Sequence, residues 1–275
     1  MARIRYHRLP TERPNPRSRA LDRLSPGAIA RLMNRADLDA LRAVGRAAPA
    51  IGRAVAAIVE RLGSGGRLIF VGAGTSGRLG VIEAAECPPT FNTRPGQVQA
   101  VMAGGRRARR GDAVVGIAAS GVTPFVRAAL VEARRRGALT VLVTCNPSAP
   151  RGAARIVIAL RVGPEVLAGS TRLKAGTATK LALNTLTTAT FTRLGKVHGN
   201  RMVDLQPRSA KLRARAERLI AELGRVSSAR ARRLLDQAGG SAKIAIVMAR
   251  RRVSAAEARR ALREAGGFLG RAAGI

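Results

Sequence analysis

Five short apolar runs, each followed by a turn or a helical stretch, constrain the fold of this chain more than any other feature. The runs are rich in β-branched residues and are scarcely interrupted by polar ones. Strands of this kind are buried on both faces, which is typical of a parallel sheet covered by helices. The expected strands are Arg67–Val71, Val98–Met102, Ala113–Ala118, Thr140–Thr144 and Ile156–Leu160. They predict an α/β fold, with a doubly wound parallel sheet in three layers.

Helical stretches are expected before, between and after these strands. They are Pro26–Ala47, Pro49–Leu62, Gly77–Glu86, Pro124–Arg136 and Ala175–Leu194. Thr123 is a natural N-cap, because Pro124 then occupies the first helical position, where a missing amide hydrogen costs nothing.

Length and composition set the expected division of the chain. With 275 residues, 46% of them apolar, the chain can form one substantial core and a smaller appendage. After Gln206-Pro207 the composition shifts to Arg- and Ala-rich helical segments. We therefore expect an N-terminal arm and helix over 1–48, a ligand-binding domain over 49–205, and a small C-terminal helical domain over 206–275.

The cysteines and the N-terminus indicate where such a chain works. Cys87 and Cys145 lie far apart and match no metal-ligand spacing, so neither a metal site nor a disulfide framework is expected. The N-terminus lacks the apolar stretch of a secretory signal, and no run approaches the ~18 apolar residues of a membrane span. We expect a cytoplasmic protein that does not associate with membranes.

The net charge raises the question of a nucleic-acid partner. The chain has 50 Lys and Arg against 16 Asp and Glu, a formal net charge of +34, and basic clusters bind phosphate backbones. The arginines are scattered over the predicted helices, however, and aromatic residues, which stack on bases, make up 2% of the chain. An arginine-rich codon usage explains the charge as well, so we do not expect a nucleic-acid partner.

A glycine-rich loop, Gly72-Ala-Gly-Thr-Ser-Gly-Arg-Leu-Gly80, follows the first strand and opens a helix. Glycines let the backbone approach an anion closely, and a helix N-terminus offers unpaired N–H groups and a positive dipole end. The hydroxyls of Thr75 and Ser76 lie at its centre, beside Gly77. The acidic residue of a dinucleotide site and the Lys-Ser/Thr pair of a P-loop are both missing. The loop therefore predicts a phosphate site of another kind.

A second strand-to-helix turn, Ser120-Gly-Val-Thr-Pro124, follows the third strand. It carries hydroxyls at Ser120 and Thr123, with Gly121 between them. Loops at the carboxyl ends of parallel strands meet at one edge of the sheet, so the two turns should serve a single ligand. Capping alone could explain Thr123.

The chain resembles the N-acetylmuramic acid 6-phosphate etherases, which belong to the sugar isomerase (SIS) domain superfamily. The matching stretches are Thr11-Glu12 with Leu21–Ser25, Gly72–Thr90, Gly116–Gly121, Thr144–Pro147, Val162–Ala178 and Gly195–Asp204. The resemblance implies a homodimeric lyase that needs no cofactor. Its substrate is a sugar phosphate, from which it removes D-lactate to leave N-acetylglucosamine 6-phosphate in the recycling of cell-wall sugars. The stretch Val162–Ala178 adds Glu165, Ser170 and Lys174 as substrate-binding candidates.

The resemblance also implies two catalytic glutamates. The catalytic acid matches Glu86, where burial near the substrate would keep the carboxyl protonated. The base belongs, in the family, to a helix after the strand that ends in Ala-Gly-Gly. Here Ala103-Gly-Gly105 is followed only by Arg106–Asp112 before the next strand. A parallel crossover takes about a dozen residues or more, so the preceding strand is unpaired, the topology is rearranged, or a deletion removed this helix.

Four other side chains are candidates to replace the missing base: Glu83, Asp112, Glu165 and His198. Structural or substrate-binding roles explain the three carboxylates at least as well, and packing explains His198. A sugar-phosphate-binding regulatory protein without catalysis is therefore the alternative function.

Overall fold

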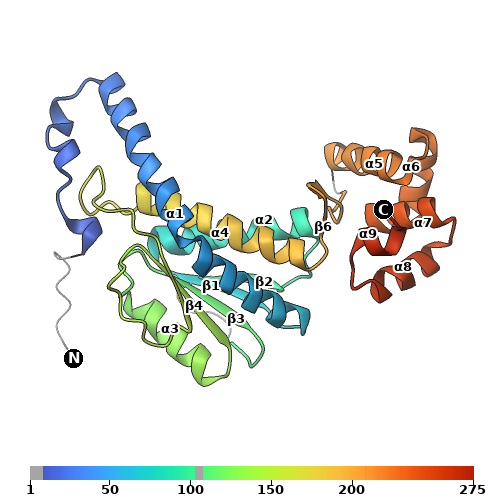
Figure 1. The fold of residues 1–275 in the computed structure, drawn as a ribbon, viewed down its shortest axis with the longest axis horizontal. Helices are drawn as coiled ribbons and strands as arrows, with labels where there is room; N and C mark the ends of the chain where they lie inside the picture. The colour runs from blue at the N-terminus through green and yellow to red at the C-terminus, as the bar shows by residue number, and fades with distance from the viewer. Residues whose placement is uncertain (1–8, 103–107, 208) are drawn as a thin grey trace. The chain divides into compact units, whose positions relative to one another are not determined.

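The computed structural model of the chain describes residues 9–102, 108–207 and 209–275 (Figure 1). The chain forms two compact units. The first comprises Met1–Ala84 and Gly96–Thr187, and the second comprises Ala85–Pro95 and Thr188–Ile275. Each unit has its own apolar core.

A parallel sheet of five strands forms the centre of the first unit. The strands are β1 (Leu68–Gly72), β2 (Val98–Met102), β3 (Ala113–Ile117), β4 (Leu139–Thr144) and β5 (Ile156–Ala159), in the order β2-β1-β3-β4-β5. Every residue of β1, β3 and β4 is buried, whereas β2 at the edge is mostly half-buried. The predicted α/β fold with a parallel sheet is therefore confirmed.

Helices cover both faces of this sheet (Figure 1). On one face α3 (Pro124–Arg135) packs on β1, β3 and β4, and its Val126, Leu130 and Ala133 join an apolar cluster with residues of those strands. On the other face α1 (Pro26–Gly63) packs on β3, β4 and β5. Two further long helices begin in this unit, α2 (Gly74–Phe91) and α4 (Lys174–Arg193).

The helix α1 is longer than expected, because Pro49 does not end it. The sequence predicted two helices, Pro26–Ala47 and Pro49–Leu62, but the structure has one helix from Pro26 to Gly63. Pro49 removes one backbone hydrogen bond, yet the buried stripe of the helix continues across it from Ala47 to Ile51. Packing outweighs this local cost, so the expected domain boundary at residue 48 falls inside a helix.

The helix α2 also extends past its expected bounds of Gly77–Glu86. It begins at Gly74, passes through Pro88 and Pro89, and ends at Phe91. Neither proline can donate to the carbonyl four residues earlier, which leaves the carbonyls of Ala84 and Ala85 without these partners. The division between the two units falls between the same two alanines.

The connection between β2 and β3 is short, but it does not unpair β2. Both strands pair in parallel with β1, on opposite sides of it. The chain must return along one strand, about 17 Å, and cross two strand spacings, about 10 Å. Residues 103–112 can span about 33 Å when extended, so a crossover without a helix can reach. The first five of these residues lie outside the part of the chain that the structure describes.

In the part of the second unit that the structure describes, five helices follow: α5 (Ala210–Gly224), α6 (Ser228–Gln237), α7 (Ala242–Arg251), α8 (Ala255–Glu264) and α9 (Leu269–Ala273). Serine side chains cap the N-termini of the first four. A short antiparallel pair, β6 (Val197–His198) and β7 (Arg201–Met202), precedes them. Among the helices that the structure describes, none is long and apolar enough to cross a membrane.

Candidate functional site

The carboxyl ends of β1 and β3 lie side by side at one edge of the sheet. Gly72, the last residue of β1, is in register with Ile117, the last residue of β3. From here β1 leads through α2 to β2, and β3 leads through α3 to β4 on the other side of the sheet. Such a reversal of strand order is where open α/β sheets bind ligands. The loops that follow both strands are the ones that the sequence singled out.

The first loop brings the backbone of β1 very close to α2. A Cβ atom on Gly72 would lie 2.7 Å from the Gly77 nitrogen, and one on Gly77 would lie 2.6 Å from the Gly72 oxygen. Any side chain at either position would push the first turn of α2 away from the strand. Gly77 donates its backbone amide hydrogen to the Ala73 carbonyl at 3.3 Å. Its role is therefore to let α2 lie close to β1, and its N–H group is not free to bind a ligand.

Thr75 and Ser76 lie in the first turn of α2, half-buried. Their hydroxyls form no hydrogen bond with any residue that the structure describes. The N–H groups of a first helical turn have no partner within the helix. The turn therefore presents two hydroxyls and the positive end of a helix dipole at the edge of the sheet, as an anion site requires.

The second loop is held in place by the strand beside it. Thr144 at the end of β4 donates its hydroxyl to the Ala119 carbonyl at 3.1 Å, and the Asn146 amide donates to the Ser120 carbonyl at 3.1 Å. Gly121 has φ +71°, and a Cβ there would lie 2.3 Å from that of Ala149. Only glycine fits this turn without displacing its neighbours.

The hydroxyls of Ser120 and Thr123 differ in the hydrogen bonds that they form. Ser120 Oγ accepts a weak hydrogen bond of 3.3 Å from the Val122 amide. Thr123 stands at the N-cap of α3, but its side chain makes no cap bond. Capping therefore does not account for Thr123, and its hydroxyl can meet a ligand.

Glu165 and Lys174, which the sequence suggested as substrate ligands, are buried at the N-terminus of α4. Glu165 is 0% exposed and accepts hydrogen bonds from the amides of Lys174 (3.1 Å) and Ala175 (2.9 Å). Burial raises the pKa of Glu165, although these hydrogen bonds act to lower it. Lys174 donates to the Val162 carbonyl at 2.8 Å and lies 3.5 Å from Asp39. Both side chains thus fix the start of α4.

Ser170 lies half-buried in the loop before α4. The N-terminal arm holds this loop through three hydrogen bonds: Gly169 N to Thr11 O at 3.0 Å, Asn15 Nδ2 to Pro164 O at 3.2 Å, and Ser18 Oγ to Val166 O at 2.7 Å. The arm therefore belongs to the site's framework, and no local pattern of residues signals this contact.

Cys145 follows β4 and is buried against the same region. Burial and the charge of Glu165 raise the pKa of Cys145 to about 12, while a hydrogen bond with Thr179 opposes them. A thiol with this pKa is protonated at neutral pH, so Cys145 is no nucleophile.

Glu86 lies on α2, in the segment that belongs to the second unit. Its side chain is exposed. The expectation that Glu86 is buried is therefore wrong for the chain by itself.

The other side chains considered as a base already bind or pack against protein groups. Glu83 is buried, accepts hydrogen bonds from Lys180 Nζ (2.7 Å) and the Thr187 hydroxyl, and ties α2 to α4. Asp112 lies at the amino-terminal edge of the sheet, opposite the two loops, where it binds Arg67. His198 lies in β6 of the second unit, with its ring beside Gly270.

The chain is similar to proteins whose activity is named. A family model described as the SIS domain matches residues 62–189. The N-acetylmuramic acid 6-phosphate etherase of Parasynechococcus marenigrum (strain WH8102) is 48% identical over 267 residues, which cover 88% of this chain and 84% of that protein. The protein of the same name from Rubrobacter xylanophilus is 47% identical over 270 residues, covering 88% and 89%.

A solved structure shares the fold at lower sequence identity. The structure of c3406 from E. coli CFT073, determined as a ligand complex, superposes with a TM-score of 0.50 and 16% identity, covering 64% of this chain and 97% of that one. This likeness concerns the fold of the sheet and its helices.

Proposed function

Because the chain belongs to the family of N-acetylmuramic acid 6-phosphate etherases, we propose that it removes D-lactate from the C3 ether of that sugar phosphate. The product is N-acetylglucosamine 6-phosphate, and the reaction serves the recycling of cell-wall sugars. The observation that carries the proposal is the pair of loops at the carboxyl ends of β1 and β3, which present several hydroxyls and the N-termini of two helices at one edge.

The phosphate of the substrate binds, in this proposal, to the first turn of α2 and to the loop after β3. Thr75 and Ser76 donate hydroxyl hydrogens from one side, and Ser120 and Thr123 from the other. Gly77 and Gly121 keep the backbone close. Ser170 contributes from the loop before α4, while Glu165 and Lys174 position that helix rather than touch the sugar. Charge-assisted hydrogen bonds of this kind are about twice as strong as neutral ones.

The chemistry needs an acid at the ether oxygen. A base takes the proton from C2, the bond between C3 and the ether oxygen breaks, and an acid protonates the departing lactate. Water then adds to the double bond and restores a hydroxyl at C3. We propose Glu86 as the acid. Its exposure in the single chain suits a group that must be reached by the substrate.

The test is release of D-lactate from N-acetylmuramic acid 6-phosphate. We expect release by the unmodified chain and a fall of about 10²–10⁴-fold in Glu86→Gln, the range for losing a general acid. Glu60→Gln makes the same charge change on an exposed position of α1 and should leave the rate unchanged. If the unmodified chain releases no lactate, the proposed activity is wrong.

One observation favours the second candidate, a regulatory protein that binds the sugar phosphate without catalysis. Only ten residues, 103–112, separate β2 from β3 in the sequence, fewer than a crossover with the base-bearing helix that the family resemblance implies would take. Calorimetric binding of the sugar phosphate with no lactate release would establish this candidate instead.

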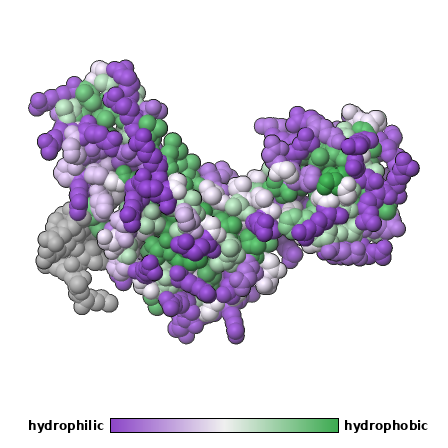
Figure 2. All heavy atoms as spheres, viewed as in Figure 1, coloured by the Kyte–Doolittle hydropathy of each residue, from purple (hydrophilic) through white to green (hydrophobic). Residues whose placement is uncertain are grey.

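We also propose that the chain works as a cytoplasmic homodimer. Large apolar side chains are exposed on α1 (Leu38, 45%; Leu41, 54%) and on α2 (Val81, 44%; Ile82, 45%). In Figure 2 green patches interrupt the hydrophilic surface along α1. Such patches are typical of interfaces. Both cysteines are buried and free, as suits a reducing compartment.

We propose a small molecule rather than a nucleic acid as the partner of the sheet edge. Every phenylalanine in the described part of the chain is buried or half-buried. Two of them, Phe91 and Phe191, stack on each other at 4.8 Å. The described surface therefore offers no aromatic platform on which bases could stack.

A further inference from the structure

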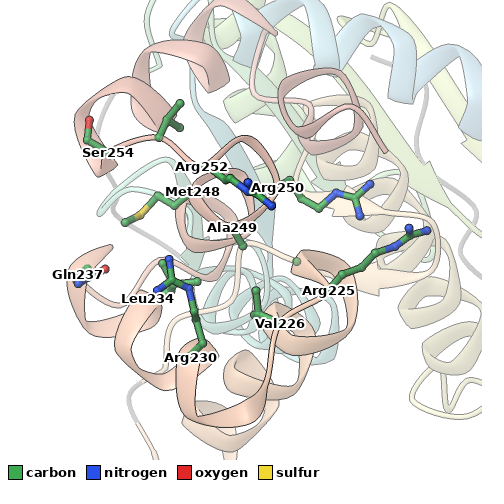
Figure 3. A pocket seen from close by; sticks show the side chains of 12 residues that line it. Arg225, Val226, Arg230, Leu234, Gln237, Met248, Ala249, Arg250, Arg252 and Ser254 are labelled. Carbon is green, nitrogen blue, oxygen red and sulfur yellow. The ribbon is translucent and has the colours of Figure 1, made fainter.

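A cavity of about 610 Å³ opens among the helices α5 to α8 of the second unit (Figure 3). Leu234 and Met248 contribute apolar side chains to its lining, and four arginines line it as well: Arg225, Arg230, Arg250 and Arg252. Figure 3 shows Arg225 and Arg250 on one side of the cavity and Arg230 beside Leu234 on the other, with Arg252 between them. None of the lining residues is acidic or aromatic.

The four arginines lack counterions among the residues that the structure describes, unlike several other arginines of these helices. Of the five acidic side chains after residue 206, four pair with arginines outside the cavity, and Glu257 accepts hydrogen bonds from Ser254, which lines the cavity. Their partners are Arg213 for Glu217 and Asp236, Arg201 for Glu222, Arg260 for Glu264, and Ser254 for Glu257. Four arginines line the cavity and one carboxylate, that of Glu257, lies against a lining residue, so the described part of the cavity keeps a net positive charge.

Two of the arginines belong to a turn that occurs twice. The tripeptide Arg225-Val-Ser227 joins α5 to α6, and the tripeptide Arg252-Val-Ser254 joins α7 to α8. In each, the arginine ends one helix and the serine caps the next. Both arginines and both valines line the cavity. The cavity is thus built from two matching turns that each present a guanidinium group.

The backbone of these two arginines is strained. Arg225 has φ 54° and Arg252 has φ 55°, in the left-handed region that glycine adopts at helix C-termini without penalty. A side chain costs about 1 kcal/mol there. Of the described residues other than glycine, only Asn92 shares a positive φ. Residues in such conformations persist where the surrounding structure holds them, and they cluster at ligand-binding sites.

We infer that this cavity binds a small anion with at least two phosphate or carboxylate groups, one for each matching turn. Guanidinium groups recognise both kinds of anion through paired hydrogen bonds. The volume lies within the range of about 300–1,000 Å³ for small-molecule sites, and the apolar lining suits a ligand with a carbon skeleton. The absence of aromatic lining residues argues against a nucleic acid strand.

Tripolyphosphate and inorganic phosphate are suitable probes, titrated calorimetrically into the full chain at about 0.1 M salt to limit unspecific charge effects. We expect tripolyphosphate to bind saturably and at least about tenfold more tightly than phosphate, because it can engage both turns. In the double variant Arg225→Gly with Arg252→Gly this binding should weaken at least about tenfold. Its Tm should not fall, because glycine suits both backbone conformations.

Matched variants separate the cavity from general charge and from the sheet edge. Arg218→Gln with Arg260→Gln removes two exposed charges outside the cavity and should change tripolyphosphate affinity less than about threefold. Ser76→Ala with Ser120→Ala removes hydroxyls from the proposed phosphate site at the sheet edge. A binding event that this variant loses belongs to that site, and the tighter tripolyphosphate binding at the cavity should remain. Should the glycine variant lose Tm, Arg230→Gln with Arg250→Gln provides the same test on helical positions.

The inference is overturned if tripolyphosphate does not bind saturably, or if the cavity variants bind it as the unmodified chain does. It is overturned equally if a short DNA duplex displaces tripolyphosphate from the unmodified chain and loses its own binding in the cavity variants, because the occupant would then be a nucleic acid.

Discussion

The Asp112 carboxylate accepts hydrogen bonds from the Arg67 backbone amide (3.0 Å), the Arg67 guanidinium (3.1 Å at Nε) and the Arg109 amide (2.8 Å). Burial by itself would raise the pKa of Asp112, but the bonds from Arg67 and Arg109 together lower it. The carboxylate joins the amino ends of β1 and β3, and so sets the register of the two strands that carry the site.

We expect Asp112→Asn to lose about 2 kcal/mol of unfolding free energy at pH 7, because it removes the charge of the buried carboxylate that pairs with the half-buried Arg67 guanidinium. Since the folded pKa of Asp112 is lowered, its contribution is present above the unfolded pKa of about 4 and is lost as pH falls through the folded pKa. Urea unfolding at several pH values measures this, and the difference from the unmodified chain should shrink below pH ~4. Asp22→Asn, at a position 79% exposed, should change stability by less than about 0.5 kcal/mol. A constant difference at all pH values would contradict the account.

Single residues show what sequence can and cannot reveal about the site. The positions of Ser76 and Ser120 at two strand-to-helix turns were predictable, because each follows a buried strand, and a helix begins at or soon after each of these turns. The roles of Glu165 and Lys174 were not, because their partners, such as Asp39 on α1, lie far away in sequence. A buried capping carboxylate and a substrate ligand look the same in one sequence.

At the scale of elements, the strands were predictable to within about two residues because β-branched apolar runs leave little choice. The ends of the helices were harder to predict than the strands. Pro49 and the pair Pro88-Pro89 are strong stop signals in sequence, yet α1 and α2 continue through them. Tertiary packing on the buried stripe decides such cases, and a local pattern does not contain it.

The continuity of α1 leads to a prediction for Pro49→Ala. Because Pro49 is exposed within a helix, alanine should restore a backbone hydrogen bond and stabilise the chain by about 1–3 kcal/mol. Ala48→Gly, at the exposed neighbouring position, should instead lose about 1 kcal/mol. Urea unfolding measures both. Lower stability in Pro49→Ala would mean that α1 needs its proline, contrary to the continuous helix.

At the scale of the whole molecule, the excess of 34 positive charges is the main feature that the fold does not explain. Many acidic side chains pair with arginine, as Glu132 does with Arg135 and Arg136, but most arginines remain at the surface. Exposed pairs contribute little to stability. The charge therefore bears on solubility and on anion binding rather than on the fold.

The proposed homodimer makes a prediction at the same scale. Leu38→Glu with Leu41→Glu should weaken self-association at least about tenfold, because it places charges in an apolar interface. Val131→Glu changes a valine that is 57% exposed on α3 and should leave association unchanged. Sedimentation velocity over a concentration series distinguishes the two, and a monomeric unmodified chain would contradict the proposal.

The central claim is that the two loops at the ends of β1 and β3 bind the phosphate of an amino sugar. Calorimetric titration with N-acetylglucosamine 6-phosphate and with the unphosphorylated sugar tests it most directly. We predict saturable binding of the phosphorylated sugar alone, weakened by about 10–100-fold in Ser76→Ala with Ser120→Ala, and unchanged in Ser64→Ala, whose residue precedes β1 at the opposite edge. Equal binding of both sugars, or full affinity in the double variant, would contradict the claim.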